Sequence, residues 1–114
     1  MSVVIFHNPR CSKSRQTLTL LQKKGIEPEI IKYLDTPPTV AELKQLYSQL
    51  NLADIRAMMR VKEEIYQILD LKDAPDEQLF EAMAKNPKLI ERPIVVSKGH
   101  AKLGRPPEQV LDIL

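Results

Sequence analysis

The spacing of apolar and polar positions changes twice along the chain. Residues 2–6 are apolar and β-branched, which predicts a strand, and leucines at helical spacing in residues 12–24 predict a helix that ends at Gly25. A second apolar segment within residues 26–34 predicts another strand. Two strands joined by a helix in this way run parallel, so the chain is expected to begin as an α/β fold.

The middle of the chain has helical spacing only. Thr39 and Glu42 have the spacing of a capping box, in which each side chain bonds to a backbone N–H at the start of a helix, so we expect a helix from there to about Gln49. Three further amphipathic stretches predict helices, at residues 51–60, 62–69 and 76–85. Together these segments predict a helical insertion over about residues 39–86.

The last part of the chain returns to the pattern of strands. Residues 93–96 predict a strand, residues 97–100 a turn and residues 101–103 a returning strand, so an antiparallel hairpin is expected. Pro106 and Pro107 predict the first turn of a final helix, where the N–H groups have no partners within the helix. The order of elements therefore indicates an α/β fold whose mixed sheet starts as βαβ and ends as ββα.

Length and composition exclude several classes of protein. The chain has 114 residues, 43% of them apolar, so we expect residues 1–114 to form a single domain. No apolar run approaches the roughly 18 to 20 residues of a membrane span, and the first residues carry no basic leader, so we expect a cytoplasmic protein without a membrane partner. Acidic and basic residues are mixed along the chain and give a net charge of +2, which argues against a nucleic-acid partner.

The only cysteine, Cys11, is the main candidate for chemistry. It follows the break at Pro9 and stands at the predicted start of a helix, where backbone N–H groups and the helix dipole favour an anion such as a thiolate. The basic residues expected to lower the pKa of this thiol are Arg10, Lys13 and Arg15. A lone cysteine forms no disulfide within the chain, which indicates a reducing compartment. The alternative is an inert cysteine in the core.

Ser14 occupies the position of the second cysteine in a C-x-x-C redox pair. Its hydroxyl can donate a hydrogen bond to a thiolate but cannot resolve a disulfide, so redox turnover requires a sulfur from another molecule, such as glutathione or a glutaredoxin-like protein. His7 either tunes the thiolate or exchanges protons with it, because imidazole titrates near neutral pH, or it is a loop histidine bonded to the backbone. His100, in the predicted turn, is expected to be solvated.

Three arginines stand at the borders of predicted elements: Arg60, Arg92 and Arg105. Arg92 and Arg105 flank the two strands of the predicted hairpin, which would bring them to the same edge. Arginine presents a fork of donors suited to an oxyanion such as phosphate or arsenate, so this pair beside a thiolate would hold an anionic substrate against it. The alternative for each is a solvated surface charge.

Three segments of the chain resemble a known family, namely residues 7–15 (HNPRCSKSR), 92–96 (RPIVV) and 105–114 (RPPEQVLDIL). They resemble the glutaredoxin-coupled arsenate reductase (ArsC) family, most closely its YfgD-like branch, and the likeness runs over essentially the whole chain. The resemblance implies a thioredoxin-like fold with an inserted helical subdomain and no metal or bound cofactor. It also implies reduction of arsenate to arsenite, with glutathione as co-substrate and glutaredoxin as partner.

The same resemblance implies roles for particular residues. Cys11 is the nucleophile and His7 adjusts its reactivity. The arginines that hold the oxyanion and its thiol adducts are Arg60, Arg92 and Arg105, and we expect them to do so without changing the reactivity of the sulfur. The supporting residues are Asn8, Ser14 and Pro93, of which Pro93 is expected to follow a cis peptide bond and to pack near Cys11.

Other functions remain open from the residues. A regulator resembling the Spx-type proteins shares this fold and binds RNA polymerase, but such proteins usually carry the C-x-x-C switch that Ser14 removes. A glutathione-linked reductase can act on mixed disulfides and not on arsenate. A phosphatase using Cys11 needs a longer phosphate-cradling loop before its arginine. Well-characterised ArsC members tend to have a small residue before the cysteine and Gly-Thr-Ser after it, whereas Arg10 and Lys13 here add positive charge.

Overall fold

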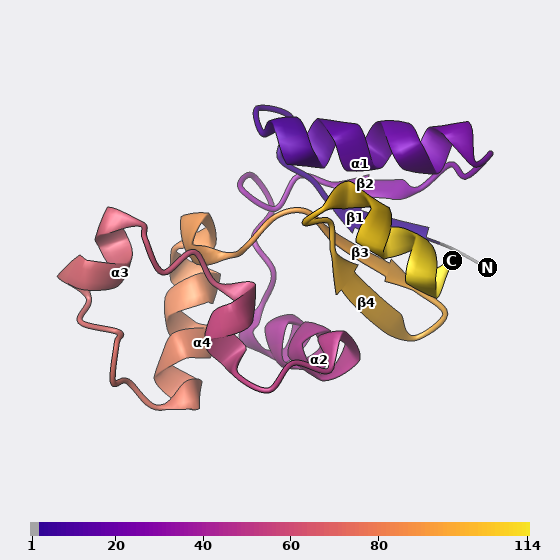
Figure 1. Cartoon of the computed structure of the whole chain (residues 1–114). Helices are drawn as coiled ribbons and strands as arrows, with labels where there is room; N and C mark the ends of the chain where they lie inside the picture. The colour runs from indigo at the N-terminus through magenta and orange to yellow at the C-terminus, as the bar shows by residue number, and fades with distance from the viewer. Residues whose placement is uncertain (1–2) are drawn as a thin grey trace. The chain divides into compact units, whose positions relative to one another are not determined.

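The computed structural model describes residues 3–114, which form two compact units (Figure 1). The first unit combines the chain up to Thr36 with Arg92–Leu114, and the second consists of Pro37–Glu91. The helical insertion predicted over about residues 39–86 falls within the second unit. In the described part of the chain, no helix has both the length and the apolar character needed to cross a bilayer.

The first unit is built on a four-stranded mixed sheet. Its strands, in the spatial order β2-β1-β3-β4, are β1 (Val3–Phe6), β2 (Glu29–Ile31), β3 (Ile94–Ser97) and β4 (His100–Leu103). The predicted parallel pairing of β1 with β2 is confirmed, and β3 runs antiparallel to both β1 and β4. Ser2, which the prediction included in the first strand, lies outside the described residues.

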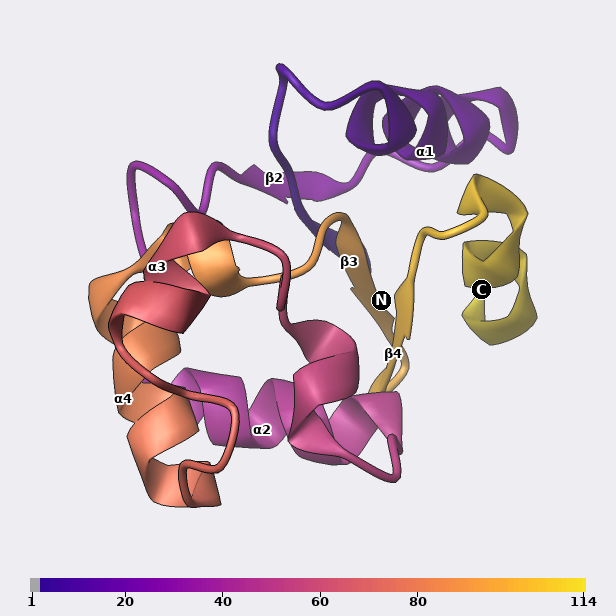
Figure 2. The same cartoon turned by 60° about the vertical axis from the view of Figure 1, so that its left-hand side comes forward.

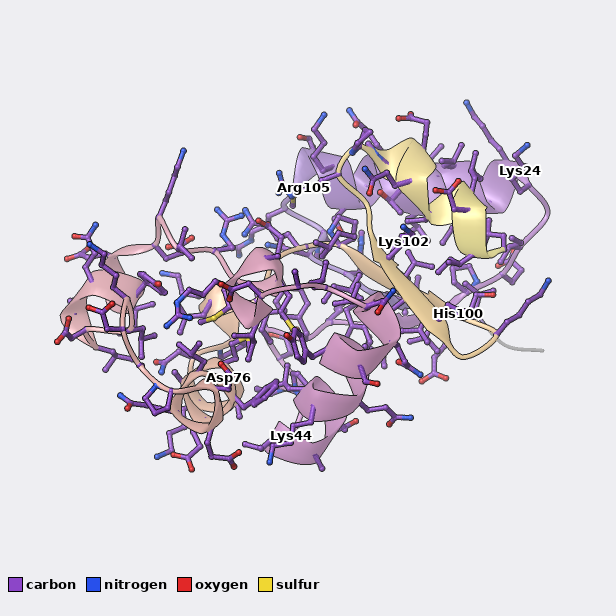
Figure 3. The ribbon with its side chains drawn as sticks, turned by 60° about the horizontal axis from the view of Figure 1, so that its bottom comes forward. Lys24, Lys44, Asp76, His100, Lys102 and Arg105 are labelled. Atoms are coloured by element: carbon purple, nitrogen blue, oxygen red, sulfur yellow. The ribbon has the colours of Figure 1, made fainter. Side chains whose placement is uncertain are left out.

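The predicted hairpin of β3 and β4 is present and turns on two residues. Ser97 pairs with His100, which leaves Lys98 and Gly99 as the loop. Both loop residues have positive φ, 55° and 79°, a combination whose twist matches that of the flanking strands. His100 is exposed at the start of β4, as expected (Figure 3).

Two helices lie beside each other against one face of the sheet (Figure 1). They are α1 (Ser12–Lys23) and the 3₁₀ helix η3 (Pro107–Ile113), so the predicted final helix is present in the tighter 3₁₀ form. The core between them and the sheet consists of four fully buried side chains, those of Ile5, Leu21, Val95 and Val110. Each of the four residues comes from a different element, namely β1, α1, β3 and η3, so the faces that carry them meet in this core.

Gly104 allows the segment after β4 to approach α1 closely. A Cβ atom at this position would lie 2.5 Å from Oγ1 of Thr17 and 2.7 Å from Cγ of Pro93, and both distances are too short for a carbon atom. Thr17 is fully buried in α1, where its hydroxyl donates to the carbonyl of Lys13 at 2.8 Å. The N–H of Gly104 donates to the carbonyl of Pro93 at 2.9 Å. The absence of a side chain at Gly104 therefore allows the segment after β4 to pack directly against α1.

The second unit contains helices only among its named elements (Figure 2). They are α2 (Val40–Leu50), η1 (Ile55–Met58), α3 (Glu64–Ile68), α4 (Asp76–Lys85) and η2 (Pro87–Leu89). The predicted capping box starts α2: the hydroxyl of Thr39 accepts from the N–H of Glu42 at 3.2 Å, and the carboxylate of Glu42 accepts from the N–H of Thr39 at 3.0 Å. Helix α2 packs on α4, where the Tyr47 and Phe80 rings meet edge to face.

The prediction of a helix over residues 51–60 is wrong. Asn51 ends α2 in the left-handed conformation, with φ of 54°, and only the single turn Ile55–Met58 follows. That turn starts at Asp54, whose carboxylate accepts from the N–H of Arg56 at 2.9 Å. The apolar spacing was helical, but short polar side chains such as those of asparagine and aspartate bond to nearby backbone and favour turns and caps over helix interiors.

We predict that Gly104→Ala lowers the free energy of unfolding by about 1 to 3 kcal/mol, because the added methyl group forces Thr17 or Pro93 to move. Urea unfolding measures the change, with Lys102→Ala in the adjacent strand β4 as a control expected to stay within about 0.5 kcal/mol of the parent. Equal unfolding midpoints for Gly104→Ala and the parent would contradict the close packing at this position.

Candidate active site

Cys11 is the N-cap residue of α1, at the end of a loop that the side chain and backbone of Asn8 hold in place. The carbonyl of Asn8 accepts from the N–H of Cys11, and its side-chain oxygen accepts from the N–H of Arg10, both at 3.0 Å. The N–H of Asn8 donates to the hydroxyl of Ser14, also at 3.0 Å. Because asparagine supplies three bonds over seven residues, the loop has one preferred path and delivers the sulfur to the helix start.

His7 is buried at the end of β1 and bonds to Ser14. Its Nδ1 lies 2.6 Å from Oγ of Ser14, and its backbone N–H donates to the carbonyl of Ile31 at 2.8 Å. Burial lowers the pKa of His7 below its ordinary value of 6.5, and the charges of Lys32 and Arg15 lower it further, so the ring is neutral at pH 7. His7 is therefore placed to orient Ser14.

The hydroxyl of Ser14 is engaged with His7 and with the N–H of Asn8. The sequence prediction assigned this hydroxyl to the thiolate of Cys11. In the structure Ser14 acts on the sulfur through its backbone N–H instead. The sequence correctly indicated that Ser14 belongs to the site, but not which of its groups faces the sulfur.

The sulfur of Cys11 lies in surroundings that favour its anion although the residue is only 8% exposed. Burial by itself raises the pKa of the thiol. The N–H of Ser14, the hydrogen bond and charge of Arg92, and the N–H of Lys13 outweigh burial, so the pKa lies below its ordinary value. The backbone N–H groups of Lys13 and Ser14 do not form a standard N-cap hydrogen bond with the Cys11 side chain, but they stabilise the negative charge of its thiolate.

Arg92 and Arg105 both reach the sulfur of Cys11, so the hairpin brings these two arginines together as predicted. Nη2 of Arg105 lies 3.8 Å from the sulfur, and its Nε donates to the carbonyl of Arg92 at 2.8 Å. The peptide bond before Pro93 is cis, as the resemblance implied, and the bond before Pro106 is cis as well. The expectation that both arginines leave the sulfur unaffected is wrong for Arg92, which lowers the thiol pKa.

Arg60 belongs to the second unit and is paired with two carboxylates. Its Nε donates to Oε1 of Glu63 at 3.0 Å and its Nη1 donates to Oε1 of Glu91 at 3.3 Å. The three side chains are 21–26% exposed, so water screens these pairs only in part. Glu63, three residues after Arg60, was recognisable from the sequence, whereas Glu91 was not. An anion that binds Arg60 must compete with both carboxylates.

Arg15 has a structural contact that the sequence analysis missed. Its Nη1 donates to the carbonyl of Pro9 at 3.0 Å, which ties the first turn of α1 back to the loop. No group of three metal-ligating side chains gathers within residues 3–114. The described groups around Cys11 are thus donors and positive charges, which suit a thiolate and an anionic partner.

The mixed sheet with α1 following β1 defines a thioredoxin-like α/β fold, and a cysteine stands at the start of that helix. The model of the ArsC family matches residues 6–113. The chain belongs to the ArsC family.

Several relatives match along all or nearly all of their length. A Haemophilus influenzae protein named arsenate reductase is 51% identical over 116 residues, covering 100% of both chains. The Escherichia coli (strain K12) protein YfgD, described as uncharacterized, is 54% identical over 114 residues, which is 98% of this chain and 96% of that protein. The solved structure of an arsenate reductase from Vibrio cholerae has a TM-score of 0.98 and 65% identity, covering 100% of this chain and 98% of that one.

We predict that Arg92→Gln raises the pH at which iodoacetamide labels Cys11 at half its maximal rate. The thiolate is the reactive form, and the variant loses a hydrogen bond and a charge that favour it. In the parent protein this midpoint should lie below about 8.5, the value of a free cysteine. Arg10→Gln, next to Cys11 in sequence and exposed, is the control and should move the midpoint less. Equal labelling midpoints for Arg92→Gln and the parent would show that Arg92 does not lower the pKa of the Cys11 thiol.

We predict that Ser14→Ala lowers stability and leaves the labelling midpoint of Cys11 nearly unchanged. The variant strips a partner from the buried Asn8 N–H and from His7, at a cost of about 1 to 3 kcal/mol in urea unfolding, but it keeps the backbone N–H that faces the sulfur. Ser12→Ala, exposed on the same turn, should change neither quantity. A raised labelling midpoint with unchanged stability would instead mean that the hydroxyl of Ser14 bonds to the thiolate.

Proposed function

We propose that this chain reduces arsenate to arsenite, with Cys11 as the nucleophile and with glutathione and glutaredoxin as the source of electrons. The observation that carries the proposal is the convergence of Arg92 and Arg105 on the sulfur of Cys11 at the start of α1. Thiolate and arsenate are both anions, so attack requires positive groups that hold them together, and guanidinium groups match an oxyanion in charge and geometry. Family membership and relatives named arsenate reductase support the same substrate.

The reaction proceeds through adducts with outside thiols, because Cys11 is the only cysteine of the chain. The thiolate attacks arsenic(V), and one oxygen leaves as water, giving a sulfur–arsenic bond. Glutathione then attacks the Cys11 sulfur, and the sulfur–arsenic bond breaks with its electron pair going to arsenic. Arsenic departs as arsenite, and Cys11 is left in a mixed disulfide with glutathione. A second thiol, from glutaredoxin, releases the Cys11 thiolate. Two thiols are oxidised and arsenic gains two electrons.

The neighbouring residues prepare Cys11 for this sequence. Arg92 keeps the sulfur as its thiolate and, with Arg105, neutralises the incoming anion. His7 is a positioning residue that acts through Ser14, whose N–H faces the sulfur. We assign Arg60 to anion binding as well, and Glu63 and Glu91 would compete with the anion for it.

We predict that Cys11→Ser abolishes arsenate-dependent oxidation of NADPH in an assay coupled through glutathione reductase, glutathione and glutaredoxin. Arg105→Lys and Arg60→Lys should each lower kcat/KM for arsenate about ten- to a hundredfold, because lysine keeps the charge and loses the fork of donors. Arg10→Lys is the matched control, expected to retain full activity.

Undiminished turnover in Arg105→Lys would show that this arginine does not bind the anion. Absence of arsenate-dependent turnover in the parent protein would show that arsenate is not its substrate. If Cys11 still formed a glutathione adduct, the result would favour a glutathione-linked reductase of another substrate.

A further inference from the structure

The first unit has a groove beside Cys11 to which the proposed function gives no occupant. It lies between α1 and the start of η3 and has a volume of about 460 Å³. Residues that line it include Ser12, Arg15, Gln16, Lys23, Pro107 and Glu108. Ser12 is the immediate neighbour of Cys11 in sequence, so one end of the groove lies next to the residue that carries the sulfur.

The charged side chains of the groove are two cations and one carboxylate, those of Arg15, Lys23 and Glu108. A ligand with more carboxylates than amino groups complements this set. An acidic tripeptide thiol of the glutathione kind has two carboxylates, one ammonium group and a sulfur, and the site needs an outside sulfur because Cys11 has no partner cysteine. Charge and chemistry therefore select the same class of ligand.

Lengths along α1 decide which cation such a ligand reaches. Arg15 is one turn from Cys11, since its N–H donates to the carbonyl of Cys11 at 3.0 Å. Lys23 lies about 16 Å beyond Ser12 at the helical rise per residue, towards the end of α1 that Lys24 marks in Figure 3. A tripeptide spans at most about 10 Å. A tripeptide thiol joined to Cys11 thus meets Arg15 and falls short of Lys23.

Arg15 is held ready for a carboxylate. Its bond to the carbonyl of Pro9 uses Nη1 and fixes the guanidinium over the loop. A guanidinium has five N–H donors, so this bond leaves capacity for a further acceptor. A side chain already fixed in place loses less conformational entropy when a ligand binds to it.

We propose that this groove binds the peptide part of glutathione, with a carboxylate on Arg15, the amino group towards Glu108 and the sulfur at Cys11. The inference rests on the proposed function, since it names the binding site of the reductant. It is testable through one exchange step: the Cys11 thiolate attacks glutathione disulfide, the Cys11–glutathione bond forms, and the original disulfide breaks with release of one glutathione thiolate. The Cys11 sulfur is oxidised and the departing sulfur is reduced, so no other reactant is needed.

The experiment compares the rate of this exchange, followed by mass spectrometry, with the rate for the neutral 2-hydroxyethyl disulfide. Arg15→Gln and Glu108→Gln should each slow the reaction with glutathione disulfide by about three- to fivefold, the size of one exposed ion pair, and change the neutral reaction less than about twofold. Lys23→Gln is the matched control, because it removes a charge from the same groove beyond the reach of the tripeptide. Its two rates should equal those of the parent protein.

Two results would overturn the proposal. Equal slowing of both disulfides by Arg15→Gln would mean that Arg15 acts on the sulfur and not on the ligand. Equal slowing by Arg15→Gln and Lys23→Gln would mean that the overall charge of the surface governs the rate. Because the exchange reaction contains no arsenate, it tests the groove even if the protein does not reduce arsenate. If the protein reduces arsenate but Arg15→Gln and Glu108→Gln exchange with glutathione disulfide at the parent rate, the proposed function holds and the proposed glutathione site is wrong.

Discussion

A buried sulfur anion is stable only where hydrogen-bond donors and positive charge replace the water that it loses, and the first unit is arranged around this constraint. Burial disfavours the thiolate of Cys11, and the opposing groups come from two distant parts of the chain. The start of α1 supplies the N–H groups of Lys13 and Ser14, and the border of the last hairpin supplies Arg92. Gly104 permits the close approach of these parts because no side chain stands between the hairpin and α1.

The same positive groups have two chemical effects that partly oppose each other. Arg92 increases the fraction of Cys11 present as thiolate, but a thiolate of lower pKa is intrinsically a weaker nucleophile. In the proposed function, recruitment of an anionic substrate by the same guanidinium would offset that loss, since proximity raises the rate of attack. Arg60 differs, because Glu63 and Glu91 already neutralise it within the second unit. In the proposed function, an anion would bind Arg60 only in competition with these carboxylates.

Features that depend on neighbours in the sequence were predictable. The pairing of Thr39 with Glu42 is a rule for residues three apart, and the hairpin over Lys98 and Gly99 follows from strands joined by a tight turn. Pairing of the two arginines at the hairpin border was also foreseen, because an antiparallel hairpin brings its outer ends together. The helix expected over residues 51–60 did not form, because Asn51 takes the left-handed conformation and the Asp54 side chain bonds to the nearby backbone, which apolar spacing does not reveal.

Contacts between residues distant in sequence were not predictable in the same way. Arg92 rather than Arg10 lowers the pKa of Cys11, although Arg10 is its neighbour in sequence, because Arg92 bonds to the sulfur whereas Arg10 is exposed. Pairing of Glu91 with Arg60, 31 residues apart, depends on how the second unit folds. The hydrogen bond of the Ser14 hydroxyl to His7 likewise depends on how the loop before α1 folds.

Having one cysteine also determines how the oxidation state of the protein follows its surroundings. A protein that closes an internal disulfide releases two glutathione molecules, so its equilibrium varies with the square of the glutathione concentration over that of the disulfide. In the proposed exchange with glutathione disulfide, a single cysteine releases one glutathione for each disulfide consumed, so the equilibrium would vary with the simple ratio of the two. The fraction of Cys11 held as such an adduct would therefore be unchanged when the whole thiol pool is diluted or concentrated, and it would respond only when the ratio of disulfide to thiol shifts.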